Sequence, residues 1–456
     1  MCRGKKDRPH WILYDLFCND NKRLRMEWRK FNEKNLFRKY ILLWFSQSIS
    51  GLGSSMTGFA LVLWAYEQSQ SAMSVSLMSF CNYVPYVILS MFVGDFIDRH
   101  KKKIIMLVSD SIAAVGSLTI LIVLLSGQLA VWYIYIINVV IGVTNAFQQP
   151  ASAVATGLLV PKDKISNISG MNSFSSNLIV VFSPMLSAFL FSIGGLSLIL
   201  LIDLASFVAA FCILLFFIVI PEQFQDREHS KPFAGIAEGF AFLRGEKGIL
   251  YIMLTMALIN FFSRLTYENI LSPMILARSS GESIALGIVN ACMGIGGIVG
   301  GVIVSVKKES THKATVIYLS AALSFLFGDL IMAIGKNTFW WSVAALAASL
   351  PIPFIMANQN AILYRKIPSA MQGRVFAVRN AIQYSTIPLG IILGGYLADY
   401  VLEPFMDSEN MFAVGLGKIV GTGTGSGMAV MFLCTGICGG LVSTLSCFNR
   451  EIKKLN

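Results

Sequence analysis

The stretch Gly94-Asp95-Phe96-Ile97-Asp98-Arg99-His100-Lys101-Lys102-Lys103 places six charged side chains within ten residues, between two long apolar runs. Those runs, residues 73–97 and 104–126, each exceed the roughly 20 residues that a helix needs to cross a bilayer. Neither run alternates between apolar and polar residues, as the strands of a membrane barrel do. Residues 94–103 are therefore predicted to be a short basic loop joining two transmembrane helices.

The same pattern continues in both directions along the 456-residue chain, which is 55% hydrophobic and only 13% charged. Ordinary soluble domains are about 25% charged, so this composition argues against a soluble protein. In lipid, only helices and closed barrels satisfy their own backbone hydrogen bonds. We therefore predict an all-α polytopic membrane protein with twelve transmembrane helices, at residues 40–66, 73–97, 104–126, 130–150, 168–193, 196–220, 249–277, 284–306, 314–334, 339–362, 376–402 and 426–448.

Lys and Arg are distributed unequally between the two sides of these predicted helices. With both termini in the cytoplasm, 32 of the 36 Lys and Arg residues fall in cytoplasmic segments and only three, Arg278, Lys336 and Lys418, fall outside. Cytoplasmic loops of membrane proteins carry such an excess. We predict a multi-pass protein of a bacterial cytoplasmic (plasma) membrane with both termini cytoplasmic. The net charge of +11 then reports topology, and no nucleic-acid partner is expected.

The longest internal polar stretch divides the predicted helices into six and six. Pro184 and Pro388 occupy matching mid-helix positions in the two halves, which favours an internal repeat of the kind found in transporters. The first 25 residues are expected to be a dispensable, disordered tail, and from Met26 the chain is either an interfacial amphipathic helix or a solvated tail. The predicted regions are a basic cytoplasmic tail at 1–39, a six-helix half at 40–220, a cytoplasmic linker at 221–248, a six-helix half at 249–448 and a cytoplasmic tail at 449–456.

Several segments together resemble a known family. The loop at 94–103 fits the pattern G-x-x-x-D-R/K-x-G-R/K-R/K, with Lys101 in place of the second glycine. Further matches are Gln47 to Ser54, Ala146 to Ala151, Gln372 to Ala377, Pro388 to Gly390 and Glu403 to Met406. The sequence resembles the macrolide-efflux branch of the major facilitator superfamily, with the enterobactin exporter as a more distant relative. This resemblance implies the twelve-helix major facilitator fold and export of a small amphiphilic compound by antiport with protons.

The basic loop also suggests a gate. Gly94 would let a helix end pack closely, and Asp98 can face a helix N-terminus or an arginine across the interface between the halves. The basic side chains would stay at the lipid surface. We predict a cytoplasmic gate, with a plain positive-inside loop as the alternative. Its residues are Gly94, Asp98, Arg99, Lys102, Lys103 and Arg374.

Polar side chains recur at helical spacing on three predicted spans, the first, the fourth and the seventh. In the resembled fold these helices line a central cavity, so the polar faces are predicted to bind substrate. The alternative is that they hold helices together. The predicted cavity residues are Gln47, Ser50, Ser54, Asn138, Asn145, Gln149, Asn260 and Tyr267.

Arg264 and Glu268 lie one helical turn apart within the seventh span. A charge in the hydrocarbon costs about 2.5 to 3.5 kcal/mol, so both should face a partner or water. We predict that Glu268 takes and releases the driving proton while Arg264 adjusts its proton affinity, with Asp203 as a further coupling residue. The alternative is a fixed structural ion pair.

Other chemistries lack the residues that they need. Gly415-Leu416-Gly417-Lys418 lacks the remainder of a phosphate-binding loop, so ATP is not expected to drive the protein. Cys434 and Cys438 have no neighbouring ligands in the sequence that would complete a metal site. No catalytic dyad stands out, so we do not expect an enzyme. We also expect no metal or cofactor, and a monomeric protein. Two alternatives stay open: a siderophore or lipid exporter of the same fold and, from a different class, a membrane-embedded enzyme or receptor.

Overall fold

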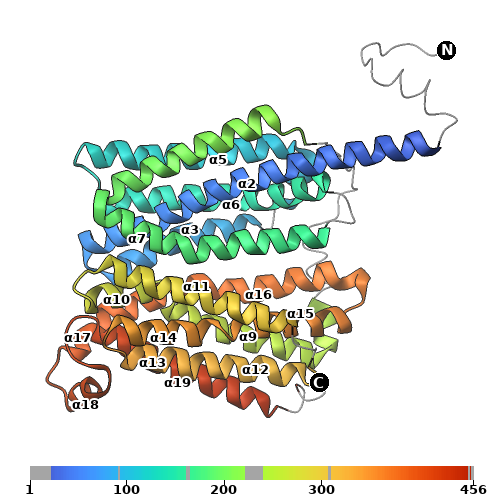
Figure 1. The fold of residues 1–456 in the computed structure, drawn as a ribbon. Helices are drawn as coiled ribbons and strands as arrows, with labels where there is room; N and C mark the ends of the chain where they lie inside the picture. Colours follow the sequence, from blue (N-terminus) through green and yellow to red (C-terminus); the bar gives the residue numbers. More distant parts are fainter. Residues whose placement is uncertain are drawn as a thin grey trace.

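The computed structural model describes residues 22–90, 93–160, 165–220, 240–306, 310–449 and 452, and within these ranges the chain is helical without strands. Its helices form two groups, one above the other in Figure 1. The first group contains α2 (Lys22–Ser69), α3 (Ala72–Ser90), α4 (Val93–Arg99), α5 (Lys102–Leu125), α6 (Val131–Leu159), α7 (Ile165–Cys212) and the π-helical turn η2 (Ile213–Phe217). The second contains α9 (Lys247–Thr266), α10 (Leu271–Arg278), α11 (Ser283–Val306), α12 (Lys313–Leu323), η3 (Ser324–Asp329), α13 (Leu330–Ile334), α14 (Thr338–Ser349), α15 (Ile352–Lys366), α16 (Ser369–Tyr396), η4 (Leu397–Leu402), α17 (Glu403–Met406), α18 (Met411–Val420) and α19 (Ser426–Cys447).

Eleven helical segments of the described chain are long and apolar enough to cross a membrane. One of them, Phe174–Phe217, has 44 residues, about twice the length of a single crossing. At Gly195 the backbone leaves the helical region, with φ +61° and ψ −161°, and Figure 1 shows α7 folding back on itself. Glycine tolerates this positive φ because it has no Cβ. Counting the two arms of α7 separately gives twelve membrane-length helices, close to the predicted boundaries, and the all-α polytopic fold is confirmed.

The first long helix, α2, begins inside the predicted tail. Residues 22–25, which were expected to be disordered, belong to α2, and this helix continues without interruption into the first span. The remainder of the proposed dispensable tail, residues 1–21, lies outside the described residues. Most of the predicted central linker lies outside them as well.

The two ends of the bundle differ, and we name them here. The basic end is the end at which α2 enters and α19 finishes (Figure 1). The connection of α4 to α5, with His100 and Lys101, lies at the same end, because α2 and α3 each cross the bundle once before it. The far end is the opposite one, which carries the turns at Gln70, Gly127 and Gly195 together with the excursion 403–425. Apolar side chains on the outer helix faces, such as Val115 and Leu125, are exposed, as expected for contact with lipid.

Among the described residues, the buried apolar cluster that both halves share lies at the far end. One cluster of buried side chains there combines residues of both halves: Leu63, Tyr66, Ala72 and Val75 with Ile270, Leu271, Met274, Ile275, Leu286 and Ala398. Toward the basic end the buried clusters belong to one half each, one built around Leu43 and Ile105 and another around Leu243 and Val375. The far end is therefore closed by packing between the halves.

The space around three glycines of α11 shows where the two halves touch and where they separate. Gly287, Gly294 and Gly301 follow one face of this helix from the far end toward the basic end. A Cβ on Gly287 would lie 2.9 Å from Ala188 Cβ, and one on Gly294 would lie 2.7 Å from Val181 Cγ2. A Cβ on Gly301 would meet nothing within 4 Å. Helices α7 and α11 therefore touch over the first two glycines and diverge toward the basic end.

Candidate functional site

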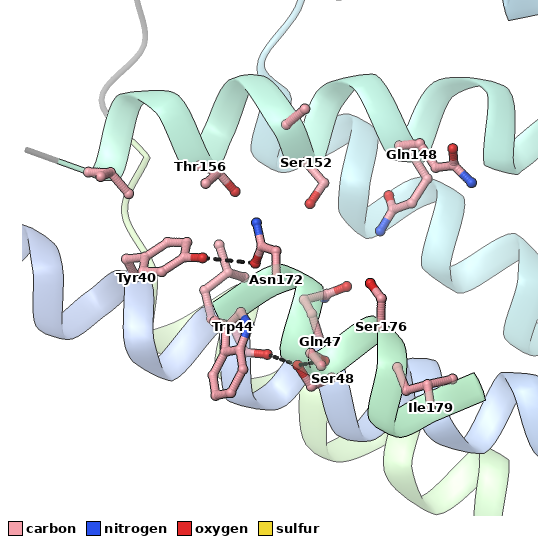
Figure 2. A pocket seen from close by; sticks show the side chains of 15 residues that line it. Tyr40, Trp44, Gln47, Ser48, Gln148, Ser152, Thr156, Asn172, Ser176 and Ile179 are labelled. Carbon is pink, nitrogen blue, oxygen red and sulfur yellow. Dashed lines mark hydrogen bonds between the residues drawn. The ribbon is translucent and has the colours of Figure 1, made fainter. Parts of the chain in front are cut away.

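A cavity of about 590 Å³ lies toward the basic end of the first half, between α2, α6 and α7. Figure 2 shows its polar side chains pointing between these helices. Aromatic and aliphatic side chains complete the wall, including Leu43 and Ile179. Its polar and aromatic lining comprises Tyr40, Trp44, Gln47 and Ser48 from α2, Gln148, Gln149, Ser152 and Thr156 from α6, and Asn172, Ser175 and Ser176 from α7.

Hydrogen bonds fix most of this polar lining. Tyr40 Oη donates to Asn172 Oδ1 at 3.0 Å, and Ser175 Oγ donates to Ser48 Oγ at 2.6 Å, so both bonds tie α2 to α7 (Figure 2). These contacts hold the shape of the wall. They also leave fewer polar groups free to bind a solute.

Behind the wall, Asp110 of α5 accepts from Gln148 Nε2 at 2.8 Å and, more weakly, from Gln47 Nε2 at 3.4 Å. Two buried polar atoms of the lining then have no hydrogen-bond partner in the described part of the chain, Gln148 Oε1 and Trp44 Nε1. One is an acceptor and the other a donor. Buried polar groups are normally paired, so both atoms have hydrogen-bonding capacity that the described residues leave unused.

A second cavity of about 410 Å³ occupies the other half, between α9, η3, α15 and α16. Its polar lining comprises Asn260, Ser263, Arg264, Tyr267, Ser324, Asp329, Gln359, Asn360, Arg379 and Gln383, alongside apolar side chains such as Met256 and Met356. Arg379 Nη1 donates to Asn360 Oδ1 at 3.0 Å, whereas the buried Gln359 Nε2 has no partner among the described residues. Gln148 and Gln359 occupy corresponding spans, and among the described residues each has one buried amide atom without a partner, Oε1 in Gln148 and Nε2 in Gln359.

Arg264 and Glu268 form the predicted ion pair. Arg264 Nη1 donates to Glu268 Oε2, and the two side chains are 33% and 25% exposed, so neither is sealed among apolar neighbours. Tyr83 Oη donates to Glu268 Oε1 at 2.8 Å, and Tyr83 belongs to α3 of the other half. The pair therefore lies at the junction of the two halves, with Arg264 in the wall of the second cavity.

Glu268 lies where the seventh span is interrupted. The sequence predicted one continuous helix over 249–277, but the structure has α9 ending at Thr266 and α10 beginning at Leu271. Pro273 has no N–H to donate to the carbonyl of Asn269, four residues earlier, which accounts for the break. The side chain of Asn269 makes its own contacts at this break: Nδ2 donates to Ser76 Oγ and to Ile391 O, both at 2.7 Å. Interrupted helices of this kind commonly carry the binding sites of transporters.

The buried acids Asp203 and Asp329 tie helices together within their own halves. Asp203, 5% exposed on the second arm of α7, accepts from Ser54 Oγ of α2 and Ser117 Oγ of α5, each at 3.0 Å. Asp329, 1% exposed, accepts from Tyr267 Oη at 2.9 Å and from Thr435 Oγ1 of α19 at 2.7 Å. Each acid thus links the first, third and sixth spans of its half.

The structure brings together part of the predicted cavity set. Gln47 and Gln149 line the first cavity, and Asn260 and Tyr267 line the second. The remaining four line neither cavity. Ser54 binds Asp203, Asn138 Nδ2 donates to the carbonyl of Ile134 in its own helix, and Ser50 and Asn145 are half-buried.

The predicted gate is described only in part. Lys103 Nζ donates to the carbonyls of Leu215 and Ile218 at 2.9 and 2.8 Å, so it caps the last span of its own half. Lys102 is buried and Arg99 exposed. Gly94 belongs to α4 and has no side chain, and the side chains of Asp98 and Arg374 lie outside the described residues.

A polar contact at the far end was not anticipated from the sequence. Asp399 of η4 accepts from the Ser71 hydroxyl at 2.5 Å and from the N–H groups of Ala72 and Met73 at 3.1 and 2.9 Å. It therefore caps the N-terminus of α3, a helix of the other half. An acid within a predicted span is a signal that could have identified it, as it did for Glu268.

Two six-helix halves, joined at one end and each enclosing a polar cavity, define a polytopic membrane protein with the architecture of a transporter. The model of the Major Facilitator Superfamily matches residues 43–391, and the chain belongs to this family. It is 27% identical over 379 residues to Macrolide efflux protein A of Streptococcus pyogenes, covering 82% of this chain and 92% of that protein. It is 21% identical over 391 residues to the Multidrug efflux pump Tap of Mycolicibacterium fortuitum, covering 79% and 89%.

Among solved structures, the nucleoside transporter NupG matches with a TM-score of 0.68 at 12% identity, covering 91% of this chain and all of that one. At this identity the likeness concerns the fold alone. The resemblance to the macrolide-efflux branch and the major facilitator fold are confirmed.

Proposed function

We propose that this protein is a secondary active exporter of small amphiphilic compounds, of the macrolide class, driven by antiport with protons. It works as a monomer in a bacterial plasma membrane, with the basic end and both termini in the cytoplasm, and it performs no chemistry on its substrate. The observation that carries the proposal is the contact of Arg264, Glu268 and Tyr83, which places a partly exposed ion pair beside a cavity and between the two halves.

The arrangement of the halves supports alternating access. The halves share a core at the far end and diverge at the basic end, so the described state is open toward the cytoplasm. Rocking of the halves would break the far-end contacts and close the basic end around the substrate. Each half contributes one cavity, and the contact of Tyr83 with Glu268 lies between the halves, so a rocking movement would change the access to that contact from each side in turn.

The coupling step follows from the chemistry of Glu268. While it is ionised, it accepts from both Arg264 and Tyr83. A proton on the carboxylate removes the charge that attracts Arg264, and hydrogen bonds to charged groups contribute about 1.5 to 3 kcal/mol each. The proton thereby weakens the contact between the halves and frees Arg264 toward the cavity. Substrate that donates a hydrogen bond to the ionised Glu268 is displaced when the proton arrives, as antiport requires.

The lining of the two cavities favours an amphiphilic substrate. Most of each wall is apolar or aromatic, with a few polar atoms that lack partners, notably at Trp44, Gln148 and Gln359. Such sites bury an apolar body and orient it through a few hydrogen bonds. The names of the efflux relatives agree with this class of substrate.

Inverted membrane vesicles test the proposal. With a macrolide as substrate and an imposed pH gradient, we expect Glu268→Gln to lose at least tenfold of the gradient-driven uptake while it retains substrate exchange at equal pH. Tyr83→Phe should keep uptake but change its pH profile, because Glu268 loses one donor. The matched control is Glu282→Gln, which neutralises an exposed acid at the far end. If Glu268→Gln transports as well as the parent across a pH series, Glu268 does not carry the proton.

A further inference from the structure

Three cations converge at the far end, where the orientation of the chain leaves very few. Arg278, Lys336 and Lys418 come from three different connections, and all three line one pocket of about 600 Å³. They are the three Lys and Arg residues that the sequence places outside the predicted cytoplasmic segments and spans. The remaining polar side chains of the pocket are those of Thr422 and Thr424, and no acid lines it.

The cations differ in how they are held. Arg278 is half-buried, and its guanidinium donates to the carbonyls of Gly335 and Val420, which fixes it in place. Lys336 and Lys418 are exposed, and neither ammonium group makes a hydrogen bond or an ion pair within the described chain. Glu403 lies close enough to offset part of the Arg278 charge, but its oxygens accept the N–H groups of Gly425 and Met428. Two positive charges of the pocket are therefore left without a counter-charge.

Helix α18 carries Lys418 and exposes large apolar side chains beside the pocket. Met411, Phe412, Val414 and Ile419 are 88%, 77%, 53% and 47% exposed, whereas Ala413, Gly417 and Val420 are buried. Figure 1 shows α18 at the lower left corner, at the far end and at the edge of the second half. A short helix with apolar side chains next to cations is typical of a segment that lies in the headgroup region of a membrane.

We propose that this pocket binds the phosphate of an anionic phospholipid in the leaflet at the far end, with the apolar side chains of α18 among the acyl chains. The charge of the pocket selects an anion, and the exposed apolar side chains select a lipid over a soluble anion. Helix α18 precedes α19 and follows η4, the turn that holds Asp399. The lipid would thus anchor the segment next to the contact that closes the far end.

Photo-crosslinking to phosphatidylglycerol tests the site on the full-length purified protein. A phosphatidylglycerol with a diazirine in its acyl chain is irradiated with the protein in detergent, and the modified peptides are mapped by mass spectrometry. We expect crosslinks within residues 411–425. A lysine near an anionic headgroup changes affinity about fivefold, so Lys336→Gln with Lys418→Gln should reduce the affinity measured by this crosslink about 25-fold.

The controls separate the possible ligands. Arg244→Gln with Lys247→Gln removes the same charge from the exposed surface of the basic end and should leave the 411–425 crosslink unchanged. Excess phosphatidylcholine and excess inorganic phosphate should not compete, whereas unlabelled phosphatidylglycerol should. Phe412→Ser should lower the yield while the pocket stays intact. Full competition by inorganic phosphate would assign the pocket to a soluble anion, and an equal yield in the double lysine variant would overturn the site.

Discussion

Removing the carboxylate of Asp399 should release the closure at the far end. This side chain belongs to the second half, and it accepts from the Ser71 hydroxyl and from the N–H groups of Ala72 and Met73 in the first half. The three donors stand at the start of α3, where the helix leaves its N–H groups unpaired and carries a partial positive charge. The contact can exist only while the far ends of the two halves touch.

The size of the effect follows from these bonds. Hydrogen bonds to a charged acceptor contribute about 1.5 to 3 kcal/mol each, and a charge at a helix N-terminus contributes about 0.3 to 1 kcal/mol. Asp399→Asn keeps one acceptor oxygen and loses the charge, so we expect the closed state to lose about 2 to 2.8 kcal/mol. At 1.4 kcal/mol per tenfold, this shifts the ratio of open to closed far ends by about 30- to 100-fold.

A buried cysteine at the far end would measure this shift. Val75 is 1% exposed in the core shared by the two halves, so a cysteine there reacts only when the far end opens. In a variant without the eight native cysteines, Val75→Cys is labelled with a membrane-impermeant maleimide added from the far-end side. The labelling rate follows the open population, and Asp399→Asn should raise it about 30- to 100-fold.

Glu403→Gln is the matched control for this measurement. Glu403 caps the start of α19 through the N–H groups of Gly425 and Met428, within one half, by the same chemistry. Its loss weakens a helix end but no contact between the halves, so labelling of Val75→Cys should stay near the parent rate. An increase of less than about threefold for Asp399→Asn, or an equal increase for both variants, would refute the latch.

Two further substitutions separate binding from packing. Gln359→Leu removes a side-chain amide of the second cavity whose Nε2 lacks a partner among the described residues, so we expect macrolide binding, measured at equilibrium, to weaken about five- to twentyfold while the melting temperature stays unchanged. Asn138 lines neither cavity, so Asn138→Leu should leave macrolide binding unchanged. Gly294→Ala places a Cβ 2.7 Å from Val181 Cγ2 and should destabilise the interface by about 1 to 3 kcal/mol, seen as a lower melting temperature, whereas Gly301→Ala meets open space and should not.

The sequence was sufficient to predict the spans, because crossing a bilayer imposes length and apolarity on each helix separately. Length and apolarity are local properties, and the turn between the two arms of α7 was placed at 193–196, around Gly195. The break in the seventh span was missed because Pro273 lies within an otherwise apolar run. A proline there removes a backbone hydrogen bond without changing the hydropathy.

The site was only partly predictable because its contacts are of two kinds. The pair of Arg264 and Glu268 is local, four residues apart on one helix, and helical spacing finds it. Tyr83 is 185 residues from Glu268, and Ser71 is 328 residues from Asp399. Helical periodicity identifies a polar face but not the helix that the face meets. For the same reason Ser54 was assigned to the cavity, although its hydroxyl binds Asp203.

Four acids of the membrane-spanning helices fall into two groups according to the contacts that they make. Asp203 and Asp329 are almost fully buried and join helices of a single half, so their bonds can persist while the halves move. Glu268 and Asp399 are only partly buried, and both accept from α3 across the interface. In the rocking cycle that we propose, the second kind of bond must break and the first can persist. In this proposed mechanism a proton on Glu268 acts on a contact that has to open in every cycle, so we infer that Glu268, and not Asp203, is the coupling residue.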